Sequence, residues 1–211
     1  MAPNGASSRP RLVLASASPC RRELLAVLGI SPDVEPVDID ERAEEAESPR
    51  ELVLRLAREK AAAAIAAVPD RGRVVVIGAD TVLDVDGEIF AKPSCDAEAR
   101  TMLSRLSGRC HRVLTGVAVA AEDQLVSDVD ITLVRFRSLD AADIDCYVAS
   151  GEPRGKAGAY ALQGRGALFV DRIEGSYHGV VGLPVHLVDQ LCERVGWSLW
   201  TWVDTVETGG G

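Results

Sequence analysis

The sequence is poor in several residue types whose abundance would define other classes of protein. Aromatic residues make up 4% of the 211 positions, and there are 5 cysteines and 3 histidines. The cysteines are odd in number and form no C-x-x-C pair, so they predict no disulfide framework. The histidines lack the spacing of metal ligands, which argues against a zinc site. Any bound metal is therefore expected to be a hard, oxygen-bound ion, with magnesium or manganese as the first choice.

No stretch of the chain stays apolar over the roughly 18 residues that are needed to cross a bilayer. The first residues, MAPNGASSRPRL, also lack the apolar core of a signal peptide. With no cysteine pairing indicated, these absences predict a cytoplasmic protein in a reducing environment. The content of 47% hydrophobic and 26% charged residues excludes disordered and collagen-like chains.

An excess of acidic residues limits the partners. The chain has 23 Lys and Arg against 32 Asp and Glu, a formal charge of −9 at pH 7. This charge disfavours sequence-independent binding to nucleic acid polymers and to anionic membranes. A polyanionic ligand would therefore need a local pocket in which basic groups are concentrated.

The length is compatible with one core or with two small lobes. The sequence contains no internal repeat and no low-complexity linker. It predicts a disordered N-terminal extension over residues 1–10, one domain over 11–205 and a frayed tail over 206–211.

A strand, a tight turn and a helix are predicted near the N-terminus. The apolar run Leu12–Ala15 is followed by Ser16-Ala17-Ser18-Pro19, after which apolar residues recur at helical spacing until Gly29. Ser18 suits an N-cap and Pro19 suits the first helical position. Backbone N–H groups at such a helix start form an anion site.

Two arginines strengthen the case for an anion at this helix start. Arg21 and Arg22 lie in the first turn, where a positive side chain opposes the helix dipole by some tenths of a kcal/mol. That cost makes sense if an anion binds there. The alternative is that both arginines are solvated and that Ser18 only caps the helix.

A second helix is predicted to begin in a capping box. Ser48-Pro49-Arg50-Glu51 has the S-x-x-E spacing, with proline in the first turn. Lys60 falls within the apolar stripe of this helix, three and four residues after Ala57 and Leu56. A lysine on that face either extends its stem along apolar surface to reach water or serves a ligand.

A central strand follows. The continuous apolar run Val74–Ile77 is typical of a strand covered on both faces, and Gly78–Thr81 is expected to close it. Asp80 would then lie at the carboxyl end of the strand, where open α/β sheets place ligand-binding groups. A carboxylate there can bind a metal or polarise a water, and the alternative is that it caps the next turn.

The remaining elements are predicted from periodicity and turn residues. In chain order they are a hairpin over 82–90 with an Asp-Gly turn, a helix from about Asp96 to Gly108, a strand pair over 112–120 and 125–137, a helix over 140–149, a strand over 167–170 and a last helix starting at Pro184. Residues 151–166 contain too many glycines for an ordinary element, so we expect a functional loop or a set of tight turns.

Taken together, dispersed motifs resemble one protein family in their order and spacing. They are LASASPCRRELL (14–25), DIDE (38–41), LAREKA (56–61), VIGADT (76–81), the pair Lys92-Pro93, LSGRCH (106–111), YALQGRG (160–166) and IEGSYHGVVGLP (173–184). The chain resembles the Maf family of nucleotide pyrophosphatases from about Leu12 to Val188. Several motifs in register make this far more specific than a single Gly-rich match.

The resemblance implies an α/β protein with a two-lobed Maf/ITPase-like fold, in which a long mixed β-sheet with flanking helices surrounds a central cleft. It also implies a homodimer. The implied reaction is metal-assisted hydrolysis of a nucleoside triphosphate between the α and β phosphates, which releases a nucleoside monophosphate and pyrophosphate.

The resemblance also assigns roles to individual residues. The matches are Asp80 as the catalytic proton acceptor, Ser16, Arg21, Lys60 and Lys92 as phosphate-binding residues, and Glu41 with Asp80 as ligands of Mg²⁺ or Mn²⁺. Phosphoryl transfer requires a protein mainly to position groups and neutralise charge, and this set does both.

Three positions bear on the choice of base. The family pattern most often reads S-P-R-R, whereas Cys20 stands at the first arginine position here. Thr81 and Gln163 match the branch of the family that acts on dTTP and UTP. A side-chain amide offers a donor and an acceptor, which suits the O4 and N3–H edge of uracil and thymine. The alternative for Gln163 is that its amide satisfies the backbone of a Gly-rich turn.

Two other functions compete with this one. The first is the same chemistry on 7-methyl-GTP or other modified nucleotides. The second is a nucleotide-binding regulator of cell division or septum formation, in which hydrolysis is incidental. The complete set of Asp80, Glu41, Lys60 and Lys92 favours the enzyme over a binding module.

Overall fold

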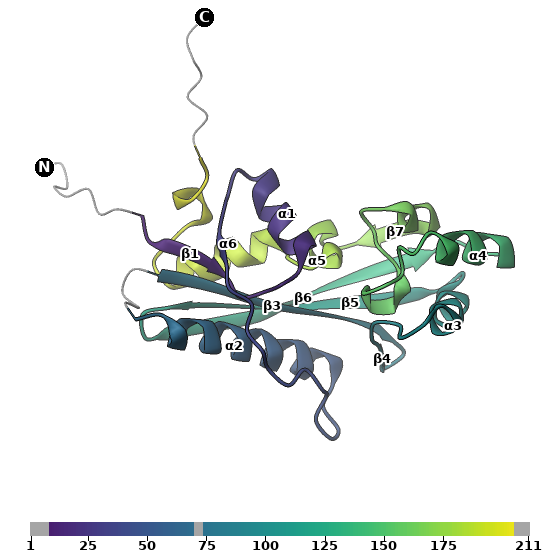
Figure 1. Ribbon diagram of the computed structural model, residues 1–211, viewed down its shortest axis with the longest axis horizontal. Coiled ribbons are helices and arrows are strands. Elements are labelled where there is room, and N and C mark those ends of the chain that lie inside the picture. The colour runs from purple at the N-terminus through teal and green to yellow at the C-terminus, as the bar shows by residue number, and fades with distance from the viewer. Residues whose placement is uncertain (1–8, 70–73, 205–211) are drawn as a thin grey trace, which may run out of the picture.

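A computed structural model describes residues 9–69 and 74–204, which form a seven-stranded mixed sheet with helices on both faces (Figure 1). The order in the sheet is β2-β1-β3-β5-β6-β7, and β4 pairs with β3. The strands are β1 (Arg11–Leu14), β2 (Asp33–Val34), β3 (Val74–Val85), β4 (Glu88–Phe90), β5 (Cys110–Ala121), β6 (Gln124–Phe136) and β7 (Val170–Glu174). Strand β1 runs parallel to β2 and β3, and all other pairs are antiparallel.

The helices divide between the two faces of the sheet. In Figure 1, α2 is the one labelled helix on one face, while α1, α5 and α6 lie on the other face. Helices α3 and α4 lie at the end of the sheet away from β1. The helices are α1 (Pro19–Val27), α2 (Pro49–Ala67), α3 (Asp96–Leu106), α4 (Ala141–Ala149), α5 (Tyr177–Val181) and α6 (Val185–Arg194), with 3-10 turns η2 (Ala157–Ala159), η3 (Arg165–Phe169) and η4 (Leu199–Thr201). The predicted mixed sheet with flanking helices is confirmed.

The alternation of side chains along β3 explains its continuous apolar run. Val75 and Ile77 pack in one core cluster with α1 and α6, whereas Val74 and Val76 pack in another with α2. Successive residues of a strand face opposite sides, so a strand covered on both faces needs apolar residues at every position.

Two glycines allow α2 to lie close to the sheet. A Cβ at Gly78 would lie 2.3 Å from the carbonyl oxygen of Ala57, and one at Gly116 would lie 2.2 Å from that of Val53. Any larger residue would push the helix away. The helix itself begins at the predicted capping box, in which Ser48 accepts a hydrogen bond from the backbone N–H of Glu51.

Strand β3 departs from the prediction. Gly78–Thr81 were expected to close the strand and to leave Asp80 at its end, but β3 continues to Val85 because β5 pairs with it from Val75 to Asp84. Gly78 is therefore a position of close helix approach inside a strand and not a strand terminator.

Other differences are local. The strand predicted over 167–170 is wrong, because η3 extends to Phe169 and β7 starts at Val170. The short elements β2 and α5 were not predicted. Val27, one of the apolar residues at helical spacing before Gly29, is 84% exposed.

The predicted extension and tail fall mostly outside the described residues, which start at Arg9 and end at Asp204. Pro10 is buried, and its carbonyl accepts a hydrogen bond from the Trp202 indole at 2.7 Å. Of the helices in residues 9–69 and 74–204, none has the length and apolar character needed to cross a membrane.

Candidate active site

One cavity of about 410 Å³ gathers all of the residues that the family motifs marked as site candidates. They arrive from separate parts of the chain. They are Ser16, Cys20 and Arg21 from the β1–α1 turn and α1, Glu41 from the segment before α2, Lys60 from α2, Asp80 and Thr81 from β3, Lys92 after β4, and Gln163 between η2 and η3.

The cavity lies at a gap in the strand pairing along one edge of β3. On this edge β1 pairs with β3 as far as Ile77, and β4 pairs with it only from Leu83 onward. No strand of the described residues therefore pairs with residues 78–82 on that side, although β5 pairs with them on the other. Asp80 and Thr81 lie in this gap, and their side chains point to opposite faces of the sheet.

On the side of the site next to α2, Lys60 forms ion pairs with two carboxylates. Lys60 Nζ lies 2.8 Å from Asp80 Oδ1 and 2.5 Å from Glu41 Oε1. Lys60 is only 6% exposed, so it does not reach open solvent as a snorkelling lysine would. The hydrogen bond from Lys60 lowers the pKa of the Glu41 carboxyl below its usual range. Asp80 faces α2 because it shares a strand face with Val76 and Gly78.

Arg21 lies on the opposite side of the gap and is buried. Its Nε donates to the Gly182 carbonyl at 2.8 Å, Nη1 donates to Ser16 Oγ at 2.9 Å, and Nη2 donates to Thr81 Oγ1 at 3.1 Å. Burial lowers the pKa of Arg21, and the nearby charges of Asp80 and Glu41 oppose that shift. Its neighbour Arg22 is exposed, so the solvated alternative holds for Arg22 alone.

The start of α1 is arranged differently from the expected cap. Ser18 occupies the N-cap position and Pro19 follows it, as predicted, but the Ser18 side chain makes no hydrogen bond to the first turn. Ser16 Oγ instead accepts from the Ser18 N–H at 3.2 Å. The residues of this turn line the cavity, so an uncapped helix start with the positive end of its dipole faces it.

The Thr81 hydroxyl forms hydrogen bonds to two other side chains, those of Thr115 and Arg21. It lies 2.9 Å from Thr115 Oγ1, which in turn donates to the Gly179 carbonyl at 2.8 Å. Because the proton of Thr115 goes to that carbonyl, Thr81 donates to Thr115 and accepts from Arg21. Thr81 thereby fixes the Arg21 guanidinium in the cavity wall.

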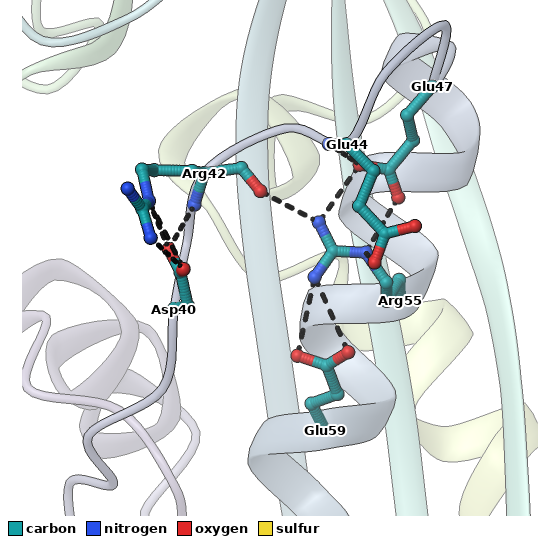
Figure 2. A network of polar contacts seen from close by, with 6 residues as sticks. All are labelled: Asp40, Arg42, Glu44, Glu47, Arg55 and Glu59. Atoms are coloured by element: carbon teal, nitrogen blue, oxygen red, sulfur yellow. Dashed lines mark hydrogen bonds and ion pairs between the residues drawn. The ribbon is translucent and has the colours of Figure 1, made fainter.

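A clamp on α2 holds the segment that carries Glu41. Figure 2 shows the guanidinium of Arg55 surrounded by this segment and by its own helix. Arg55 donates to Glu47 Oε1 at 2.7 Å, to the Arg42 carbonyl at 3.0 Å and to Glu59 Oε1 at 3.3 Å. The bond to Arg42 fixes the backbone directly after Glu41.

The Gly-rich segment is a set of tight turns, one of the two predicted outcomes. Gly158 has φ +66°, and a Cβ there would meet the Leu83 side chain at 2.4 Å. The Glu152 carboxylate accepts from the Arg165 and Gly166 N–H groups at 3.0 and 3.1 Å. Gln163 is exposed at the cavity, and its amide makes no hydrogen bond to the described part of the chain.

The family model for Maf-like proteins matches residues 11–195. The chain belongs to the Maf family. It is 47% identical over 191 residues to a protein of Symbiobacterium thermophilum named dTTP/UTP pyrophosphatase, covering 90% of this chain and 97% of that one. A protein of the same name from Salmonella typhimurium is 51% identical over 174 residues, covering 82% and 87%.

Among solved structures, the Staphylococcus aureus Ham1 protein is 21% identical, with a TM-score of 0.40 over 60% of this chain and 71% of that one. A likeness at that level carries no argument about the fold or the site.

The donor set of this Maf protein fits a magnesium ion. Residues 9–69 and 74–204 contain no group of three or more His, Cys, Asp or Glu side chains that could hold a metal. Two carboxylates, Glu41 and Asp80, meet at Lys60 in the cavity. Mg²⁺ is usually bound by one or two carboxylates together with waters and substrate phosphates, so this set suits an ion that shares its ligands with a nucleotide.

Three contributors to the site were not predicted as such: Lys156, Thr115 and Arg55. Lys156 lines the cavity from the Gly-rich segment, whose composition was the one available signal. Thr115 acts through Thr81, which is 34 positions away, and Arg55 acts through Glu47 and the Arg42 carbonyl in the segment before its own helix. No motif in the sequence indicated either contact.

Proposed function

We propose that this chain hydrolyses dTTP and UTP between the α and β phosphates, producing a nucleoside monophosphate and pyrophosphate. The observation that carries the proposal is the meeting of Asp80 and Glu41 with Lys60 in a cavity that also contains Arg21 and Lys92. The Maf relatives named above support the choice of nucleotides.

The cavity has the charge that a triphosphate requires. The cations of Arg21, Lys60 and Lys92 outnumber the carboxylates of Glu41 and Asp80, although the chain as a whole carries −9. In phosphoryl transfer, positioning and charge neutralisation supply most of the catalysis. Ser16 orients Arg21, and the uncapped start of α1 adds N–H donors for phosphate oxygens.

Asp80 is proposed as the group that orients and deprotonates the attacking water. It is mostly buried and keeps one carboxylate oxygen on Lys60, so its position is fixed before substrate binds. A magnesium ion held by Glu41 and Asp80 would neutralise phosphate charge when bound. Glu41 also binds the Lys60 ammonium, so Asp80 is not the only carboxylate that balances the cations. Asp80 can therefore act on the attacking water.

Base selection is assigned to Gln163, Thr81 and Cys20. Gln163 presents an amide with both a donor and an acceptor at the cavity, which suits the edge shared by uracil and thymine. Thr81 contributes by holding Arg21, and Cys20 contributes by contacting the Gly-rich segment through Lys156.

Product analysis tests the proposal. Purified protein is incubated with UTP, dTTP, ATP and 7-methyl-GTP, with Mg²⁺ or Mn²⁺, and products are separated by ion-exchange chromatography. We expect UMP or dTMP with pyrophosphate, and faster turnover of the two pyrimidine nucleotides. UDP with orthophosphate would overturn α–β cleavage. Preferred turnover of 7-methyl-GTP would support the alternative substrate, and binding of UTP without turnover would support the regulator of cell division.

A homodimer, implied by the family resemblance, is part of the proposal. Sedimentation equilibrium tests it independently of activity, and a single species of monomer mass across a micromolar concentration range would contradict it.

A further inference from the structure

The ammonium of Lys156 lies in the cavity with a weak partner. Its Nζ contacts Cys20 Sγ at 3.3 Å, and Lys156 is half-buried. An ammonium has three N–H donors, whereas a thiol sulfur is a weak acceptor. Within residues 9–69 and 74–204, no carboxylate forms an ion pair with Lys156. The other N–H donors of this ammonium are therefore not taken up by acceptors in the described part of the chain, and they are available to a ligand in the cavity.

The other cations of the cavity are more committed. Lys60 is paired with two carboxylates, and Arg21 uses each of its nitrogens on a protein acceptor. Lys92 resembles Lys156 in having no ion pair in the described part of the chain. Lys92 and Lys156 are thus the cations that can give their full hydrogen-bonding capacity to a ligand.

The backbone holds these two lysines in the same wall. The Gly158 N–H donates to the Ala91 carbonyl at 3.2 Å, which joins the turn after Lys156 to the residue before Lys92. Gly155 and Gly158 have φ of +72° and +66°, a region that glycine adopts without strain. The turn that presents Lys156 is therefore built into the fold.

Cys20 leaves room for this ammonium. It is the second residue of α1, at the uncapped helix start that faces the cavity, and its side chain is short and carries no positive charge. Lys156 brings a positive charge to this helix start from a segment 136 positions away. The helix start and the ammonium thus place N–H donors and positive charge side by side, an arrangement that suits a phosphate group.

We infer that Lys156 is a phosphate-binding residue of this site and supplies, across the cavity, the cation that position 20 itself lacks. The inference rests on the proposed function, because the phosphate in question belongs to the triphosphate substrate. A phosphate oxygen replaces the Cys20 sulfur as the acceptor for Lys156, and a charged acceptor forms a stronger hydrogen bond than a thiol.

The test uses the Lys156→Met variant with two readouts. The first is calorimetric binding of inorganic triphosphate, which needs no hydrolysis. The second is the separate measurement of KM and kcat for UTP. We expect binding of inorganic triphosphate to weaken and KM to rise by about tenfold or more, the usual effect of losing a hydrogen bond to a charged group. Arg165→Met is the matched control, since Arg165 lies in the same segment outside the cavity and its loss changes the net charge equally.

A rescue variant separates binding from support of the loop. In Lys156→Met/Cys20→Arg, a guanidinium at position 20 returns positive charge to the same space, and we expect binding of inorganic triphosphate to recover to within about threefold of wild type. Weak binding in Lys156→Met that Cys20→Arg does not restore would overturn the inference, as would equal losses in Lys156→Met and Arg165→Met. A wild-type protein that binds inorganic triphosphate but does not hydrolyse UTP would refute the proposed function and leave the role of Lys156 standing.

Discussion

Lys60 Nζ lies 2.8 Å from Asp80 Oδ1, and this ion pair joins helix α2 to the middle of strand β3. The same ammonium binds Glu41, so one cation holds together two carboxylates that would otherwise repel each other. Both side chains of this ion pair are mostly buried. A variant at either position therefore has to be measured for activity and for stability separately.

Asp80→Asn is expected to abolish most of the activity while leaving the fold intact. The amide oxygen still accepts from Lys60, but the side chain can no longer take a proton from water. We predict a loss in kcat of at least about 100-fold for UTP, typical of acid–base groups. Steady-state kinetics and thermal melting measure the two effects. Asp86→Asn, on the exposed turn after β3, should keep wild-type turnover, and an Asp80→Asn variant with turnover near wild type would remove Asp80 from the mechanism.

Gln163→Glu is expected to change base selectivity. An ionised carboxylate accepts hydrogen bonds but cannot donate one to O4 of uracil or thymine. Leaving a buried acceptor unpaired costs about 1–3 kcal/mol, so kcat/KM for UTP and dTTP should fall about tenfold or more. ATP and GTP should be affected less. Equal losses for all four nucleotides would show that Gln163 supports the Gly-rich segment and does not contact the base.

Arg55→Met is expected to release the segment that carries Glu41. The bonds from Arg55 to Glu47 and to the Arg42 carbonyl would be lost, so amides of residues 40–47 should exchange with solvent faster. We predict a decrease of about threefold to tenfold in kcat/KM, by the loss of positioning.

A cycle with Glu41→Gln identifies the route of this effect. If Arg55 acts through Glu41, adding Arg55→Met to Glu41→Gln should cause little further loss. Arg58→Met is the control, since Arg58 is exposed on the same helix. Faster exchange in the segment with unchanged activity would show that the clamp has no part in the reaction.

His111 is expected to make stability depend on pH. Burial lowers the pKa of His111 to about 4, against about 6.5 in an unfolded chain. The unfolded state therefore binds the proton more readily between these values, and folding stability is lost as pH falls from 6.5 toward 4. We predict that wild type loses about 2 kcal/mol of unfolding free energy through His111 between pH 7 and pH 5.

Urea unfolding at the two pH values measures this dependence. His111→Phe should remove most of the difference, although its absolute stability should also fall because Tyr160 loses its hydrogen-bond partner. His178→Gln, which changes a less buried histidine, should keep the wild-type difference. A wild-type difference that survives in His111→Phe would assign it to other groups.

The sequence by itself determined the features that depend on neighbours in the chain. The capping box at Ser48 and the proline at the start of α1 are fixed by contacts three residues apart or fewer, so their patterns predicted the helix starts correctly. Lys60 also stood out locally, as a charge in an apolar stripe. The motifs around Asp80 and Gln163 resembled those of one family, which supplied candidates but no geometry.

The tertiary structure alone decided how these residues meet. Asp80 lies in the middle of β3. One edge of β3 is open there because β1 pairs with it only as far as Ile77 and β4 pairs with it only from Leu83 onward. The contact of Lys156 with Cys20 spans 136 positions, and that of Thr81 with Arg21 spans 60. Such contacts follow from strand order and from the packing of helices on a sheet. No pattern in a short window of sequence contains that information, because the partners become neighbours only when the whole sheet has formed.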